Sequence, residues 1–145
     1  MRPCWPNDQV VLMKRMQGRT IRAGRGRGRA LVSQEPIGFL GGVDPETGIV
    51  IEKGHPLEGE SISGRVLVFP TGKGSTVGSY TLYRLAQNNL GPAAIINAQS
   101  EAIVAVGAII SDIPMVDQID IAQIQSEDTV IVDDGVVTVD RTDLC

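Results

Sequence analysis

Short apolar runs alternate along this chain with stretches rich in glycine and polar residues. Residues 64–69 and 93–97 each contain a continuous apolar run, typical of strands buried on both faces. Between them, Leu82, Leu85 and Ala86 recur at helical spacing, which predicts an amphipathic helix from about residue 75 to residue 88. Residues 101–110 predict a second short helix, although their Val and Ile content leaves helix or strand open.

The remaining strands are predicted early and late in the chain. Residues 20–23, 29–33 and 49–51 read as short strands, and Asp134 and Gly135 separate two Val-rich runs in the manner of a hairpin turn. Helices in the middle and strands on either side predict one α/β domain without internal repeats.

The N-terminal residues 1–17 are predicted to form a flexible arm that precedes a single domain of residues 18–145. Pro3 and Pro6 interrupt regular structure there, and Met13 and Met16 are alternative translation starts to Met1.

Composition excludes several classes of function. The chain has 145 residues, a net charge of −4 and a pI near 4.9, which argues against general nucleic-acid binding. No apolar run approaches the roughly 20 residues that a membrane span requires. Residues 1–15 lack the continuous apolar core of a signal peptide, so the cytoplasm is the expected location.

Arginine and glycine alternate between residues 24 and 29. In a strand, Arg25, Arg27 and Arg29 would share one face, and the intervening glycines would leave the other face open for close backbone packing. The arginine face is either a solvated edge or a basic surface for a partner or an anion. Aromatic residues make up only 3% of the chain, which further disfavours RNA because few side chains can stack on bases.

The two cysteines, Cys4 and Cys145, lie at opposite ends of the sequence, and the only histidine is His55. Zinc and iron–sulfur sites need three or four clustered Cys or His ligands. No such site can be built from this chain alone, so any metal cofactor is expected on another polypeptide.

The segment from Phe69 to Ser79 joins a predicted buried strand to a predicted helix. Gly72 and Gly74 allow a sharp turn, and a helix beginning at Ser75 or Thr76 would direct free N–H groups and its positive dipole end toward one point. The segment is therefore a plain capped turn, an anion cradle, or a catalytic serine site in which the helix and Lys73 favour the alkoxide of Ser75.

Neither common phosphate-binding motif fits this segment. A Walker A loop needs Ser or Thr directly after its lysine, whereas Gly74 intervenes here, and Val77 stands where the dinucleotide fingerprint needs its third glycine. A second candidate loop contains Gly41, Gly42 and Asp44, and it is either a site or subunit-facing loop or a simple turn. His55 is expected to be a turn residue with local hydrogen bonds.

Five stretches carry a resemblance to a known family. In order and spacing they cover roughly residues 20–116: residues 28–33, 39–44, 55–59, 66–79 and 91–94. On these residues the chain resembles the small subunit, or swivelling domain, of the aconitase X family. The resemblance implies an α/β fold of the swivelling β/β/α type, with a mixed sheet or barrel and two or three helices.

The same resemblance implies an activity. The family removes water from a hydroxylated acid with an iron–sulfur cluster, so a large subunit carrying a [4Fe–4S] cluster is the expected partner and this chain is expected to bind no metal itself. In archaea such a pair acts as phosphomevalonate dehydratase, forming trans-anhydromevalonate 5-phosphate for isoprenoid synthesis, and bacterial relatives dehydrate cis-3-hydroxyproline. The family's proton-accepting serine matches Ser75.

The resemblance also orders the other candidate residues and the competing functions. Contacts to the small anionic substrate are expected from two groups of residues, which are Gly72, Lys73, Gly74 and Thr76 in the first loop and Gly41, Gly42 and Asp44 in the second. A cis-3-hydroxyproline dehydratase small subunit is the near alternative. A non-catalytic anion-binding or regulatory module is the alternative of another class, and an RNA-binding module ranks third.

Overall fold

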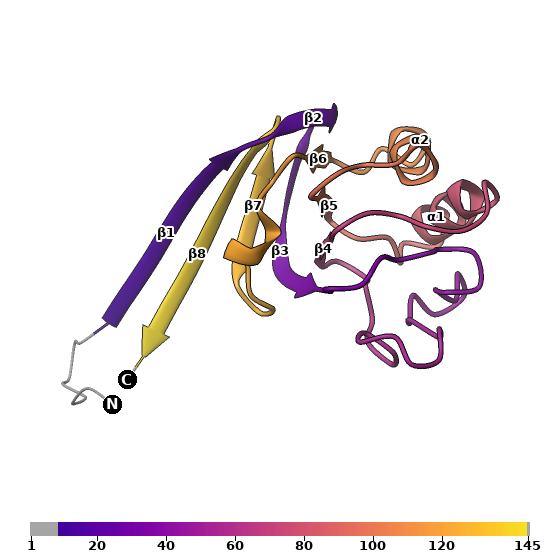
Figure 1. Ribbon diagram of the computed structural model, residues 1–145, viewed down its shortest axis with the longest axis horizontal. Coiled ribbons are helices and arrows are strands. Elements are labelled where there is room, and N and C mark those ends of the chain that lie inside the picture. The colour runs from indigo at the N-terminus through magenta and orange to yellow at the C-terminus, as the bar shows by residue number, and fades with distance from the viewer. Residues whose placement is uncertain (1–8, 145) are drawn as a thin grey trace.

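The described residues form one eight-stranded mixed sheet with two α-helices on one side (Figure 1). The computed structural model describes the backbone of residues 9–144 and the side chains of residues 13–141. The elements, in chain order, are β1 (Gln9–Gln17), β2 (Arg19–Arg22), β3 (Arg25–Val32), β4 (Val66–Phe69), α1 (Gly78–Gln87), β5 (Ala94–Asn97), α2 (Ala102–Ile110), β6 (Met115–Asp117), the 3₁₀ turn η1 (Ile121–Gln123), β7 (Thr129–Asp133) and β8 (Val136–Leu144).

The sheet curls until its two edges approach each other. Its strand order is β1-β8-β7-β3-β4-β5-β6-β2; β3 to β6 run parallel, and the other neighbours are antiparallel. The edge strands β1 and β2 are consecutive in the chain and are separated only by Gly18, whose N–H donates to the carbonyl of Gly135 at 2.9 Å. The result is a nearly closed barrel from which the β1–β8 ribbon projects, as Figure 1 shows.

Strands β4 and β5 are buried on both faces. Val66 and Val68 of β4 pack inside the curled sheet against valines of β7 and β8, whereas Leu67 and Phe69 face the helices. Residues 37–62, which lie between β3 and β4 and form only isolated bridges, complete the core on the helix side. This two-sided burial confirms the interpretation of the continuous apolar run.

The alternation of arginine and glycine in β3 reflects a close backbone crossing. Arg25, Arg27 and Arg29 are exposed, as predicted. On the opposite face, a Cβ added at Gly26 would collide with the carbonyl oxygen of Ala93, and one added at Gly28 would lie 2.6 Å from the carbonyl oxygen of Gly64. The glycines therefore let the segments that lead into β4 and β5 pass directly against β3.

Two sequence-based expectations need correction. The arm of residues 1–17 was expected to lack regular structure, but Gln9–Gln17 forms β1, which pairs with β8 from Gln9↔Leu144 to Gln17↔Val136. Residues 1–8 lie outside the described residues. The first helix begins at Gly78, later than the expected residue 75, because the Gly78 N–H bonds the Ser75 carbonyl in a tight turn at 2.9 Å.

Two other expectations are confirmed. Residues 102–110 are helical, and the Glu101 carboxylate caps this helix by accepting from the N–H groups of Ile103 and Val104. Asp134 and Gly135 form the hairpin turn between β7 and β8, with φ values of 44° and 88° that suit a type I′ turn.

We predict that Gly26→Ala lowers the free energy of unfolding by about 1–3 kcal/mol, because the added methyl group forces β3 away from Ala93. Denaturant unfolding of the isolated chain measures this change. Arg27→Ala, one position along on the exposed face of the same strand, is the control and should change stability by less than about 0.5 kcal/mol. Equal stability of the two variants would contradict the close backbone crossing of β3 and Ala93.

Candidate active site

The candidate site lies where the four parallel strands end. The segments that follow β3, β4 and β5, together with Asp117 at the end of β6, meet at this edge of the sheet. Ligands of open α/β sheets bind outside the carboxyl ends of the strands, because the loops there are free to vary while the strands stay fixed. The Ser75 segment follows β4, near the middle of the row.

Ser75 caps the turn that precedes α1. Its Oγ accepts a hydrogen bond from the Val77 N–H at 3.2 Å, and its carbonyl accepts from the Gly78 N–H at 2.9 Å. Ser75 is exposed. The hydroxyl is therefore accessible to a ligand while its oxygen already receives one backbone donor at the positive end of a helix.

Three consecutive backbone N–H groups lie at this serine. Among the hydrogen bonds of the described residues, the N–H groups of Gly74, Ser75 and Thr76 have no partner, and all three residues are exposed. Gly74 has φ +97°, a conformation that L side chains rarely adopt. Successive free N–H groups at a helix start form a favourable environment for an anion.

Lys73 points to a carboxylate and not to the serine hydroxyl. Its Nζ lies 3.1 Å from Oε1 and 3.2 Å from Oε2 of Glu52. Glu52 belongs to the loop between β3 and β4, and sequence reasoning missed it because nothing local to residues 49–54 signals a partner 21 positions away. The Lys73 ammonium is thus paired with Glu52, and the groups next to Ser75 are backbone N–H donors.

Gly72 gives the Ser75 segment its close approach to α2. A Cβ at Gly72 would lie 2.5 Å from Glu101 Oε1 and 2.5 Å from a methyl group of Val104. Gly72 is buried, so its role in this structure is packing.

The second candidate loop runs beside the first. Ile37 and Gly72 form a parallel bridge, and the Lys73 N–H donates to the Ile37 carbonyl at 3.1 Å. Gly42 lies next to Glu52, because a Cβ added there would be 3.9 Å from Glu52 Oε1. Gly41 is exposed, with φ +76° and open space around it. The structure therefore brings Gly41 and Gly42 to the Ser75 side of the molecule.

Asp44 serves a turn elsewhere in this loop. Its Oδ1 accepts from the Glu46 N–H at 2.9 Å, and Glu46 in turn pairs with Arg84 in the last turn of α1. Ser75 precedes the first turn of the same helix, so Asp44 lies toward the other end of α1. Its carboxylate stabilises the loop and is not assembled with the serine.

His55 fastens the loop between β3 and β4. Its Nδ1 accepts from the Leu57 N–H at 3.0 Å, and Nε2 lies 3.0 Å from the Pro36 carbonyl oxygen. A backbone N–H can only donate and a carbonyl can only accept, so the ring is neutral with its proton on Nε2. The ring is buried and both of its nitrogens have hydrogen-bond partners, as predicted for a turn residue.

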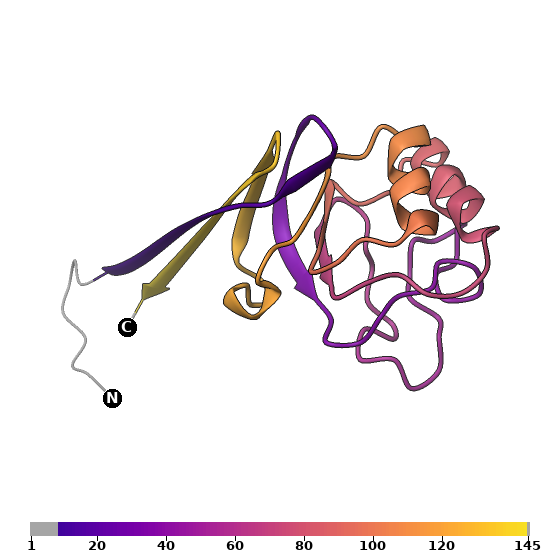
Figure 2. The same cartoon turned by 45° about the horizontal axis from the view of Figure 1, so that its top comes forward.

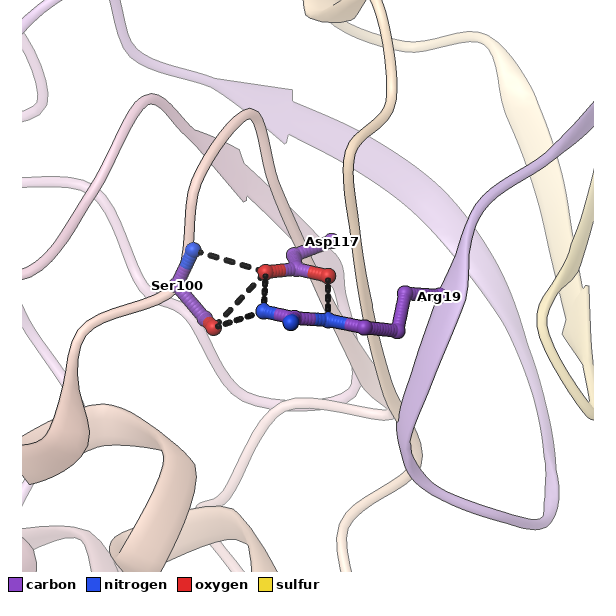
Figure 3. Close-up of polar contacts among 3 residues, drawn as sticks. All are labelled: Arg19, Ser100 and Asp117. Carbon is purple, nitrogen blue, oxygen red and sulfur yellow. Dashed lines mark hydrogen bonds and ion pairs between the residues drawn. The ribbon is translucent and has the colours of Figure 1, made fainter.

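A fully buried carboxylate orients an exposed arginine at the same edge of the sheet. Asp117 accepts from Arg19 Nε at 3.0 Å and Nη2 at 2.7 Å, and from both the backbone N–H and the Oγ of Ser100 (Figure 3). Burial alone would raise the pKa of the Asp117 carboxyl, but the hydrogen bonds from Arg19 and Ser100 and the arginine charge outweigh it and lower that pKa. Asp117 is therefore ionised at neutral pH.

The comparisons with known proteins identify the family. Residues 15–140 match the family model described as the aconitase X swivel domain. The chain belongs to the aconitase X swivel domain family. This membership agrees with the expected swivelling fold, which the mixed, nearly closed sheet and two α-helices display.

Individual relatives extend over most of this swivel domain. It is 58% identical over 121 residues to the phosphomevalonate dehydratase small subunit of Methanocella arvoryzae, covering 81% of this chain and 92% of that protein. It is 54% identical over 119 residues to the protein of the same name from Thermococcus kodakarensis, covering 82% and 90%. The crystal structure of Thermococcus kodakaraensis aconitase X in its holo-form aligns with a TM-score of 0.85 at 52% identity, covering 87% of this chain and 98% of that one.

Two kinds of feature are absent from the described residues. Among the described residues, no group of three His, Cys, Asp or Glu side chains is placed to hold a metal ion. Within that same part of the chain, no helix has the length and apolar character needed to cross a membrane.

We predict that Asp117→Asn lowers the free energy of unfolding at pH 7 and that the difference from the wild type shrinks as the pH falls below about 3.8, the ordinary pKa of an aspartate. The folded-state pKa of Asp117 is lowered, so its contribution is complete above the unfolded-state pKa and is lost as the pH falls through the folded-state pKa. Denaturant unfolding at several pH values measures this effect.

The matched control is Asp112→Asn. Asp112 also pairs with an arginine, Arg22, at 3.0 Å, but its side chain is 82% exposed. An exposed pair contributes only about 0–1 kcal/mol, so this variant should stay close to the wild type at every pH. A constant difference between Asp117→Asn and the wild type down to pH 2 would contradict the assignment.

Proposed function

We propose that this chain is the small subunit of a phosphomevalonate dehydratase, which converts (R)-5-phosphomevalonate to trans-anhydromevalonate 5-phosphate in a modified mevalonate pathway. The observation that carries the proposal is its similarity to relatives named phosphomevalonate dehydratase small subunit, at 58% and 54% identity over most of both chains. The activity is a hydro-lyase reaction, and it requires a larger partner subunit, as the name of the relatives implies.

Ser75 is the proton acceptor in this proposal. Loss of water from a hydroxylated acid removes a proton from one carbon and the hydroxyl group from its neighbour, leaving a double bond between them, and Ser75 Oγ accepts the proton in alkoxide form. A free serine hydroxyl is a weak base. The Val77 N–H on Oγ and the positive end of α1 both stabilise the alkoxide, which supports this role without Lys73.

The free backbone donors hold an anionic group of the substrate. Phosphomevalonate carries a carboxylate and a phosphate, and the N–H groups of Gly74, Ser75 and Thr76 suit either of them. The substrate would then be fixed within reach of the Ser75 hydroxyl. Gly41 and Gly42 border the same side of the site.

The cofactor belongs to the partner in this proposal. The described residues offer no ligand set for an iron–sulfur cluster, so the [4Fe–4S] cluster is expected on the larger subunit. A cytoplasmic location stays a prediction.

We predict that Ser75→Ala lowers kcat of the reconstituted two-subunit enzyme by at least about 100-fold, the scale of a lost general base. Assembly with the larger subunit should persist, because the variant removes one exposed hydroxyl. Steady-state assay of phosphomevalonate dehydration, together with size-exclusion chromatography of the complex, measures both outcomes.

Ser126→Ala is the matched control for this variant. The Ser126 Oγ likewise accepts one backbone hydrogen bond, from the Val32 N–H at 3.1 Å, but it lies in the loop before β7. This control should retain wild-type kcat. Wild-type turnover by Ser75→Ala would remove Ser75 from the reaction.

We also predict that the reconstituted enzyme dehydrates (R)-5-phosphomevalonate and leaves cis-3-hydroxyproline unchanged. Mass spectrometry of the two reaction mixtures distinguishes the substrates. Turnover of hydroxyproline alone would replace the proposed activity with that of the bacterial relatives. Tight assembly without turnover of either compound would favour a non-catalytic module.

A further inference from the structure

The outer surface of the helix pair is apolar. Figure 2 shows α1 and α2 side by side at the end of the molecule opposite the β1–β8 ribbon. The side chains of Tyr80, Val106 and Ile110 are 67%, 49% and 43% exposed, and Val77 and Ile109 are also exposed. On a single-domain protein, a contiguous exposed apolar patch often marks an interaction site.

Tyr80, Val106 and Ile110 line a groove of about 360 Å³ between the helices. Ile103, Val106 and Ile110 of α2 form one side, and Thr76 and Tyr80 belong to the other. We call this surface the helix groove.

The helix groove is held in shape by close helix packing. The Ser79 hydroxyl donates to the Ile103 carbonyl at 2.6 Å, and a Cβ at Gly107 would lie 2.9 Å from Leu82 Cδ2. A hydrogen bond and a glycine contact across the helices leave little freedom for the groove to close. The apolar surface is therefore pre-formed and does not depend on a partner to appear.

We infer that the helix groove is the surface on which the larger subunit docks, with an apolar segment of that subunit filling it. The existence of that subunit rests on the proposed function. The location rests on Thr76, which lines the groove and is the neighbour of Ser75 in sequence. A protein seated in the groove therefore extends to the Ser75 turn, where the proposed reaction needs groups that this chain does not supply.

The character of the groove favours a protein over a lipid surface. Helices that lie on membranes carry Lys or Arg beside their apolar face. Residues 102–110 contain no charged residue at all, and the Arg84 side chain of α1 is paired with Glu46 at 2.6 Å. An apolar, uncharged groove matches the dry centre of a stable protein–protein interface.

Val106→Glu and Tyr80→Glu test this inference. Both positions are exposed, and glutamate favours a helix at least as well as valine or tyrosine, so the fold should be retained. An unpaired carboxylate buried in the interface is costly, so each variant should bind the purified larger subunit at least 10-fold more weakly by titration calorimetry. Met13→Glu, at a 68% exposed position on the β1–β8 ribbon, is the matched control and should bind as the wild type does.

The outcomes separate this inference from the proposed function. Weaker binding by the groove variants but not by Met13→Glu, with unchanged thermal unfolding of the isolated chains, supports the docking surface even if the wild-type complex shows no dehydratase activity. Wild-type affinity of Val106→Glu overturns it. The inference is also overturned if light scattering shows that the wild-type chain is a homodimer and that the groove variants are monomers which still bind the larger subunit. The groove would then be a self-association surface.

Discussion

The closure of the sheet at Gly18 is the constraint on which the arrangement of the site depends. The chain leaves β1 at one edge of the sheet and enters β2 at the other edge within one residue, and a Cβ at Gly18 would collide with the Asp117 carbonyl. This close passage sets Arg19 opposite Asp117. Asp117 has no exposed surface, and its burial favours the neutral carboxyl, but the hydrogen bonds from Arg19 and Ser100 and the arginine charge lower its pKa and keep it ionised. Closure of the barrel therefore supplies the arginine that helps to keep this carboxylate ionised.

The same carboxylate connects the barrel to the edge of the sheet that carries Ser75. Asp117 holds Ser100 through two hydrogen bonds, and the next residue, Glu101, both caps α2 and packs against Gly72. The Ser75 turn is thus supported by a continuous set of contacts that begins at the sheet edge. Strands buried on both faces supply the rigid part, and the loops at their carboxyl ends carry the candidate site residues.

The features that could be predicted from the sequence are those that depend on neighbouring residues. The apolar run of β4, the turn at Asp134 and Gly135 and the capped turn at Ser75 all follow from neighbouring residues. Strand β1 could not be predicted, because its partner β8 lies at the other end of the chain. The Lys73–Glu52 ion pair was missed for the same reason. The assignment of Ser75 as a site came from the family resemblance, since a structural cap and a catalytic serine share one local pattern.

That shared pattern has a physical basis. The hydrogen bond that caps the turn, from the Val77 N–H to Ser75 Oγ, strengthens when the oxygen becomes an alkoxide, because a charged acceptor binds an N–H more tightly than a neutral one. The free N–H groups of Gly74 and Thr76 add donors at the same helix start. Lys73, paired with Glu52, contributes little net charge there. The turn that begins α1 therefore offers backbone donors to negative charge, which supports the proposed role of Ser75.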